Sequence, residues 1–250
     1  MEIVTVVRPD AESASQVVAD RFITLVKANP RATLGLATGG TPVETYRLLV
    51  EAYQAGTVNF EDVQTFNLDE YIGLAADHPQ SFRYFMQQQF FDHVNVDPKR
   101  THVPNGVADN VDSTCAEYEA LIRDGGGIDL QLLGIGHNGH IAFNEPGSLL
   151  ESRTRMVSLT DETIENNARF FDSREEVPRH AITMGIQTIL EAREIILLAL
   201  GEAKSEAVDK LLYGPVTDAH PASALQNHKR VTVVLDAVCA SGIKQLADSL

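Results

Sequence analysis

The alternation of short apolar runs with longer amphipathic segments is the sequence feature that most constrains the fold. Each run is almost continuously hydrophobic, which is typical of strands covered by helices on both faces. The segments between them repeat apolar residues at helical spacing. This order predicts an α/β fold with a doubly wound, mostly parallel, Rossmann-like sheet and helices on both faces. The predicted strands are Ile3–Val7, Thr33–Ala37, Val63–Leu68, Leu130–Ile135, Ile195–Leu200 and Val231–Leu235.

The predicted helices lie between these strands, and two of them carry clear end signals. Asp10 is placed to cap the first helix and Pro30 to stop it, while Ser81 is placed to cap a later one. The later helices are predicted over Pro42–Ala55, Ser81–Phe91, Asp112–Asp124, Thr160–Phe171, Ile186–Ala192 and Lys204–Leu212.

Length and composition indicate one globular domain over residues 1–250. A chain of 250 residues with 44% hydrophobic and 22% charged residues can bury a core without staples, and it shows no internal repeat or low-complexity linker. Cys115 and Cys239 are its only cysteines, so a disulfide framework and a Cys-rich zinc site are excluded.

The charge balance disfavours two classes of partner. With 20 basic and 35 acidic residues the formal net charge is -15, which leaves no basic surface for nucleic acid or for an anionic membrane. The sequence also shows no apolar run long enough for a spanning helix and no signal peptide pattern, so we expect a cytoplasmic protein.

Chemistry is expected in the loops after the strands, because open α/β sheets bind ligands outside the carboxyl ends of their strands. In the first such loop, Gly39 and Gly40 can turn backbone N–H groups toward an anion, Thr41 can cap the next helix, and Pro42 suits its first turn. The lysine and spacing of a Walker loop are missing. From these residues alone, an anion site and an ordinary turn are equally good interpretations.

Two adjacent carboxylates, Asp69 and Glu70, follow the third predicted strand. Burial at the end of a strand raises the pKa of a carboxyl group toward that of a useful general base. Because neighbouring strand residues point to opposite faces, only one of the two should enter the site. The alternative is that Asp69 simply caps the next helix or turn.

The third loop, residues 134–147, contains the pattern G-x-G-x-x-G. A dinucleotide-binding fingerprint needs a helix directly after the glycines, whereas this loop runs into Asn144, Pro146 and Gly147. The residues therefore disfavour a dinucleotide cofactor.

His137, His140 and Glu145 in this loop allow two further interpretations, a metal site and an acid–base site. Gly139 interrupts the spacing of a helical ligand pair and no other Cys or His cluster is near, so no metal is predicted. A histidine with a nearby carboxylate can move protons near neutral pH, since the carboxylate fixes the tautomer of the ring.

Two basic residues, Arg169 and Lys204, could complete a phosphate site beside the glycine-rich loop. Lys204 near a helix start is unfavourable for the helix dipole, which suggests another reason for its position. Each of the two, taken alone, is also compatible with an ordinary surface charge.

Four sets of motifs together resemble the glucosamine-6-phosphate deaminase family, in the family's order and over nearly the whole chain. They are LGLATGGTPVETY; TFNLDEYIGL with DHPQSFRYFM; GIGHNGHIAFNEPG with SRTR; and ITMGIQTILEA with LGEAKSEAV. TGGTP is shared with the related 6-phosphogluconolactonases. The resemblance implies conversion of glucosamine 6-phosphate and water to fructose 6-phosphate and ammonia, in N-acetylglucosamine catabolism, with no metal or organic cofactor.

The resemblance also implies roles for single residues. Asp69 matches the enolisation base, and His140 matches the ring-opening acid/base with Glu145 oriented against it. Asn138 matches a position that is Asp or Asn among members, which implies hydrogen bonding there and no charge. Gly39, Gly40, Thr41, Arg169 and Lys204 match the phosphate site, and residues 160–182 match a mobile lid.

The partner so implied is a small sugar phosphate, and the sequence leaves open whether the chain forms a homo-oligomer. Val157 stands where members activated by N-acetylglucosamine 6-phosphate carry a basic residue, which argues against that activation although Ser148 and Arg155 match. A 6-phosphogluconolactonase would be expected to carry a D-G-H-T-A-S-type loop in place of NGHIAFNEPG. A sugar-phosphate-sensing regulator should add a basic helix-turn-helix segment.

Overall fold

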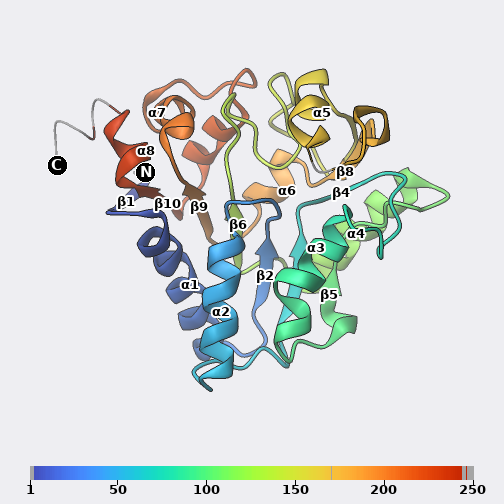
Figure 1. Cartoon of the computed structure of the whole chain (residues 1–250), viewed down its shortest axis with the longest axis horizontal. Helices are drawn as coiled ribbons and strands as arrows, with labels where there is room; N and C mark the ends of the chain where they lie inside the picture. Colours follow the sequence, from blue (N-terminus) through green and yellow to red (C-terminus); the bar gives the residue numbers. More distant parts are fainter. Residues whose placement is uncertain (1–2, 170, 244–245, 247–250) are drawn as a thin grey trace.

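The computed structural model describes residues 3–169, 171–243 and 246, and its larger sheet is the predicted parallel one (Figure 1). Its strand order is β1-β10-β9-β6-β2-β3-β5, with every neighbouring pair parallel. The bounds are β1 (Val4–Arg8), β2 (Thr33–Leu36), β3 (Gln64–Asn67), β5 (Thr101–His102), β6 (Leu130–Leu133), β9 (Ile195–Ala199) and β10 (Val231–Asp236). The six predicted strands are confirmed with ends that differ by no more than two residues, and the two-residue β5 was not predicted.

A second, antiparallel sheet was not predicted. It has the order β4-β8-β7, formed by β4 (Asp69–Tyr71), β8 (His180–Thr183) and β7 (Arg155–Ser158). Its strands have three or four residues each, and Asp69 pairs with Thr183 from a distant part of the sequence. The chain thus passes from the large sheet into the small one between Asn67 and Asp69.

The helices confirm most of the predicted ends. The Asp10 side chain accepts a hydrogen bond from the Ser13 N–H, and Ser81 caps its helix through the Tyr84 N–H. Thr41 was predicted to cap α2, and this is wrong, because Pro42 occupies the cap position in a helical conformation. The helices are α1 (Ala11–Ala28), α2 (Val43–Gln54), α3 (Phe82–Gln89), α4 (Val111–Asp124), α5 (Asp161–Ala168), α6 (Ile186–Leu190), α7 (Ser205–Tyr213) and the unpredicted α8 (Ala237–Ser241), with short 3-10 helices at Phe91–His93, Pro98–Arg100, Arg174–Glu176, Glu202–Lys204 and Pro221–Asn227.

Two apolar clusters hold the fold together. The main core lies around the seven-stranded sheet and includes β2, β6, β9, β10 and the buried faces of α1 and α2, which pack against each other (Figure 1). The small cluster lies by the second sheet, below α5, and its buried members are Tyr71, Leu159, Ile164, Val177 and Ala181. The small cluster is the only apolar support described for α5, since no residue of α5 is a member of the main core.

The order of the strands fixes where a ligand can bind. From β2 the chain first adds β3 and β5 on one side, and it later adds β6, β9 and β10 on the other. The loops after β2 and β6 therefore leave the sheet at its switch point, where a crevice forms in this class of sheet. None of the helices that the structure describes has the length and apolar character to cross a bilayer.

Candidate active site

A cavity of about 850 Å³ opens at this switch point. The loops after β2, β6 and β9 line it together with β4 and α5, so all the predicted loops meet there. The predicted site residues in its wall are Gly39, Gly40, Thr41, Asp69, His140, Arg169 and Lys204. Asn138 and Glu145 stand behind the wall and reach it through His140.

Three of the elements that line the cavity carry groups that suit an anion. Gly39 has a φ of 92°, in the left-handed region that glycine adopts without strain. Lys204 follows β9, and burial lowers the pKa of its ammonium group, an effect that the neighbouring Cys239 partly offsets. Arg169 reaches the same cavity from the carboxyl end of α5. A glycine-rich turn and two cations from separate elements can together hold a phosphate.

The loop that carries Lys204 is fixed from below by a buried carboxylate. Asp236, at the end of β10, accepts hydrogen bonds from the Gly201 N–H at 3.0 and 3.1 Å and from the Cys239 N–H at 2.8 Å. Gly201 has a φ of 82° at this turn. This support has no local signal in the sequence, because Gly201 and Asp236 are 35 residues apart.

The adjacent carboxylates Asp69 and Glu70 have different environments. Asp69 lines the cavity, and burial together with the charge of Glu70 raises its pKa to about 8. Glu70 accepts hydrogen bonds from the N–H groups of Tyr71, Phe82 and Arg83 at 2.9 to 3.0 Å, and burial outweighs these bonds to raise its pKa to about 7. Only Asp69 enters the site, as alternation predicted, and the carboxylate that holds the start of α3 is Glu70.

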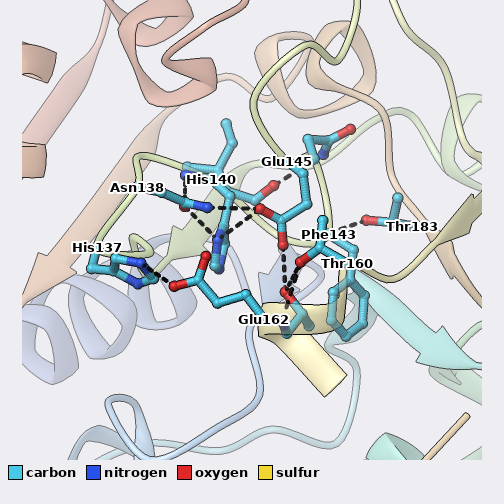
Figure 2. Close-up of polar contacts among 11 residues, drawn as sticks. His137, Asn138, His140, Phe143, Glu145, Thr160, Glu162 and Thr183 are labelled. Carbon is cyan, nitrogen blue, oxygen red and sulfur yellow. Dashed lines mark hydrogen bonds and ion pairs between the residues drawn. The ribbon is translucent and has the colours of Figure 1, made fainter. Parts of the chain in front are cut away.

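His140, Asn138 and Glu145 form a connected chain of hydrogen bonds (Figure 2). The His140 Nδ1 atom lies 2.8 Å from the Asn138 amide oxygen, which can only accept, so Nδ1 carries the proton. The Asn138 amide nitrogen donates to Glu145 Oε2 at 2.9 Å, and His140 Nδ1 is 3.5 Å from the same oxygen. This tautomer leaves Nε2 of His140 as a proton acceptor.

Glu145 is ionised in this arrangement. Burial raises its pKa, but hydrogen bonds from His140, Thr163 and Asn138 outweigh burial and bring the pKa to about 2. The carboxylate is therefore a fixed negative charge beside the imidazole, and it favours the protonated ring that forms when His140 takes a proton.

Two contacts join this loop to the first turn of α5. The Thr163 hydroxyl donates to Glu145 Oε1 at 2.6 Å. The Glu162 carboxylate lies 2.8 Å from His137 Nε2 (Figure 2). Sequence analysis did not identify Thr163 as a site residue. The one local signal at Thr163 is the capping pattern with Thr160. The role of Thr163 in the site depends on Glu145, which lies 18 residues away in the sequence.

The backbone of the loop is shaped to place His140. A Cβ atom on Gly136 would lie 2.3 Å from the His140 ring, and one on Gly139, where φ is 87°, would lie 2.1 Å from His220. Ala142 has a φ of 51°, in the left-handed region although it is not glycine. Asn144, fully buried, donates to the carbonyls of Ile141 and Met184 and ties the loop to β8.

The candidate metal ligands do not converge. His137 faces Glu162, whereas His140 faces Asn138 and Glu145. Within the described ranges there is no group of three or more His, Cys, Asp or Glu side chains arranged to hold a metal ion. A dinucleotide fingerprint would require a helix directly after the glycines, and the described segment between β6 and β7 contains none.

Comparison with known proteins identifies the family. A model of the family described as glucosamine-6-phosphate isomerases/6-phosphogluconolactonase matches residues 9–234. The chain belongs to this family. It is 57% identical to a glucosamine-6-phosphate deaminase of Rhodopirellula baltica, with 93% of each chain covered, and 52% identical to one of Hahella chejuensis, with 96% of this chain and 91% of the relative covered.

Solved structures of the family show the same fold. A monomeric glucosamine-6-phosphate deaminase superposes with a TM-score of 0.93 at 46% identity, over 96% of this chain and 99% of the other. A 6-phosphogluconolactonase from Trypanosoma cruzi superposes with a TM-score of 0.78 at 21% identity, over 96% and 97%. The second likeness shows only that the fold is shared across the family's two activities.

Proposed function

We propose that this chain is a glucosamine-6-phosphate deaminase, which converts glucosamine 6-phosphate and water to fructose 6-phosphate and ammonia. The observation that carries the proposal is one cavity holding a buried carboxyl group of raised pKa, an imidazole with a free Nε2, and two cations beside a glycine turn. The names of its relatives, 57% and 52% identical over most of the chain, support the same activity.

His140 opens the sugar ring in this mechanism. Its Nε2 atom takes the proton of the hydroxyl group at C1, and the imidazolium returns a proton to the ring oxygen as the C1–O5 bond breaks. Glu145 stabilises the imidazolium, while Asn138 holds the ring in the required tautomer. These three residues are proposed to act as one acid–base unit.

Asp69 moves the proton between carbons. Its carboxylate removes the proton on C2 of the open chain and delivers it to C1, while one proton of the substrate's ammonium group passes to O1; C2 then carries an iminium group and O1 a hydroxyl. Water adds at C2, its proton passes to the nitrogen, and the C2–N bond breaks, which releases ammonia and leaves a carbonyl at C2. Asp69 acts in its ionised form, whose fraction rises as the pH approaches its pKa of about 8; this form is a stronger base than an ordinary aspartate, which suits removal of a weakly acidic carbon-bound proton.

The phosphate group anchors the open chain. Gly39, Gly40 and Thr41 are proposed to bind it with Arg169 and Lys204. Fixing one end of a flexible substrate turns the proton shift into an oriented, effectively unimolecular step. Residues 160–182 are proposed as a lid of this single domain. Among the described residues, α5 leads directly into Arg169 and rests only on the small cluster. Residue 170 of the proposed lid and both ends of the proposed domain lie outside the described residues.

A 6-phosphogluconolactonase is the competing activity within the family, because that fold is shared. Opening a lactone requires attack at a carbonyl carbon, and no base is needed for a carbon-bound proton. The buried Asp69 in the cavity wall favours the deaminase. A sensor without catalysis would use the phosphate site, but it would have no need of the His140–Asn138–Glu145 unit.

Two further properties are proposed with this activity. Cys115 and Cys239 are both free and buried, which suits the reducing cytoplasm. The structural relative with a TM-score of 0.93 is a monomer, and we propose the same state for this chain.

The direct test is an assay of purified, chelator-treated protein with glucosamine 6-phosphate, with and without N-acetylglucosamine 6-phosphate. Equimolar release of ammonia and fructose 6-phosphate is expected, with no dependence on the second compound. Absence of both products while the substrate still binds would favour the sensor, and hydrolysis of 6-phosphogluconolactone alone would favour the lactonase.

A further inference from the structure

The contact between Thr163 and Glu145 has a role beyond packing α5. Thr163 is almost fully buried, lines the cavity, and donates to Glu145 Oε1 at 2.6 Å. The other carboxylate oxygen, Oε2, accepts from Asn138. Glu145 is thus held by one donor from its own loop and one donor from α5.

The hydrogen bonds form one continuous series from the start of α5 to the imidazole. The Thr160 hydroxyl donates to Thr163 Oγ1 at 3.0 Å, Thr163 donates to Glu145, Asn138 joins Glu145, and His140 donates to Asn138. Thr163 accepts from Thr160 and donates to Glu145, while Asn138 accepts from His140 and donates to the same carboxylate, so both branches end on Glu145 and strengthen one another. The orientation of the imidazole therefore depends on where α5 lies.

The same helix carries a substrate-binding group. Arg169 lies six residues after Thr163, directly after the last residue of α5, and lines the same cavity. Ile164, the next residue after Thr163, joins α5 to the small cluster and not to the main core. A phosphate bound by Arg169 would therefore hold the whole short helix, and Thr163 with it, against the loop.

We propose that Thr163 is a positioning residue that completes the His140–Asn138–Glu145 unit when α5 closes on the bound phosphate. Ring opening is then efficient only when the substrate is anchored, which is specificity by assembly of the site. This inference rests on the proposed deaminase function. It assigns Thr163 no contact with the reacting atoms.

The test compares four variants with the wild type in the deaminase assay. Thr163→Val keeps the shape and the backbone N–H that Thr160 caps but removes the hydroxyl donor, while Thr163→Ser keeps the donor. Thr163→Ala paired with Thr163→Ser gives a second comparison that differs only in the hydroxyl, in case the valine variant does not fold. Asp161→Asn is the control, because it loses only an exposed ion pair of the same turn, with Arg174.

The expected result is a fall of about tenfold in kcat for Thr163→Val and Thr163→Ala, with KM within about threefold of the wild type, since a hydrogen bond to a charged group is removed. Thr163→Ser should recover most of kcat, and Asp161→Asn should stay within about twofold.

Three results would overturn the inference. A rise in KM with kcat unchanged would mean that Thr163 only packs the helix, and equal losses in Thr163→Ser and Thr163→Ala would mean that the hydroxyl is not the active feature. If the wild type itself releases no ammonia, the proposed function fails first. An active wild type with an unaffected Thr163→Val variant removes only the role of Thr163.

Discussion

The main core and the small cluster support different parts of the active site. The main core holds the sheet from which the loops of Gly39, Lys204 and His140 emerge. The small cluster has five buried members and supports α5, which brings Thr163 and Arg169. Regions with few buried apolar contacts open at lower free energy than a main core. The loops that carry the proposed catalytic groups therefore rest on the more stable part of the fold, whereas α5, with Thr163, rests on the part that is expected to open more readily.

Loss of the carboxylate at Asp69 should have the largest effect. Asp69→Asn removes the proposed base, so kcat should fall by about 10³–10⁴-fold, the size of a general acid–base contribution, while KM stays close to that of the wild type. Steady-state assays and exchange of the C2 hydrogen with solvent measure this. Near-normal turnover would exclude Asp69 as the base.

Matched truncations compare the two clusters directly. Leu34→Ala in β2 should lower the free energy of unfolding by about 3 kcal/mol, because it leaves a void in a fully buried core. Ile164→Ala in α5 should lower it by less than about 1 kcal/mol and instead raise KM, because α5 then opens separately. Denaturant unfolding with limited proteolysis distinguishes them, and equal losses of global stability would show one cooperative unit.

Replacement of the imidazole tests the part of the site that rests on the main core. His140→Gln should lower kcat about 10²-fold on cyclic glucosamine 6-phosphate, because ring opening loses its proton carrier. Binding of an open-chain analogue, followed by calorimetry, should change little. A matching loss of affinity for the open-chain compound would argue against a ring-opening role.

The raised pKa of Asp69 also predicts how stability depends on pH. Between about pH 4 and pH 8 the unfolded chain has released this proton while the folded chain, whose pKa is about 8, retains it. The unfolding free energy therefore falls as pH rises through this window. Asp69→Asn lacks this penalty, so its unfolding free energy should gain on that of the wild type by up to about 1.4 kcal/mol per pH unit across this window. Thermal unfolding from pH 5 to pH 8 measures the difference, and a constant offset would contradict it.

The smallest effect is expected at the proposed phosphate site. Lys204→Ala should raise KM about tenfold with kcat nearly unchanged, because Arg169 and the glycine turn remain to bind the phosphate. Inorganic phosphate should inhibit this variant less than the wild type. An unchanged KM would dissociate Lys204 from the phosphate.

The large sheet was predictable because its signals are local. Continuous apolar runs identify strands buried on both faces, and single residues such as Asp10 and Ser81 mark helix starts. The small sheet gave no such signal, since β4, β7 and β8 are short and find their partners far along the chain. Thr41 was mistaken for a cap because Pro42 takes that position in a helical conformation.

The sequence predicted which loops line the cavity, but not the hydrogen bonds between their side chains. Ends of strands indicated the loops that line the cavity, and alternation indicated that only one of Asp69 and Glu70 enters it. The roles given to single residues came from the family resemblance. The contacts of Asn138 with Glu145, and of Thr163 with the same carboxylate, depend on side-chain directions that only the folded loop determines.

Ala142 shows what this loop gains from an unfavourable backbone. A left-handed conformation costs an ordinary residue roughly 1–2 kcal/mol, and glycine would avoid that cost. Glycine would also add freedom to the unfolded chain and to the loop itself. The methyl group narrows the set of shapes that the segment between His140 and Glu145 can sample. The backbone between His140 and Glu145 is therefore restricted before any substrate arrives, and what is left to be set is the contact that α5 makes with Glu145 through Thr163.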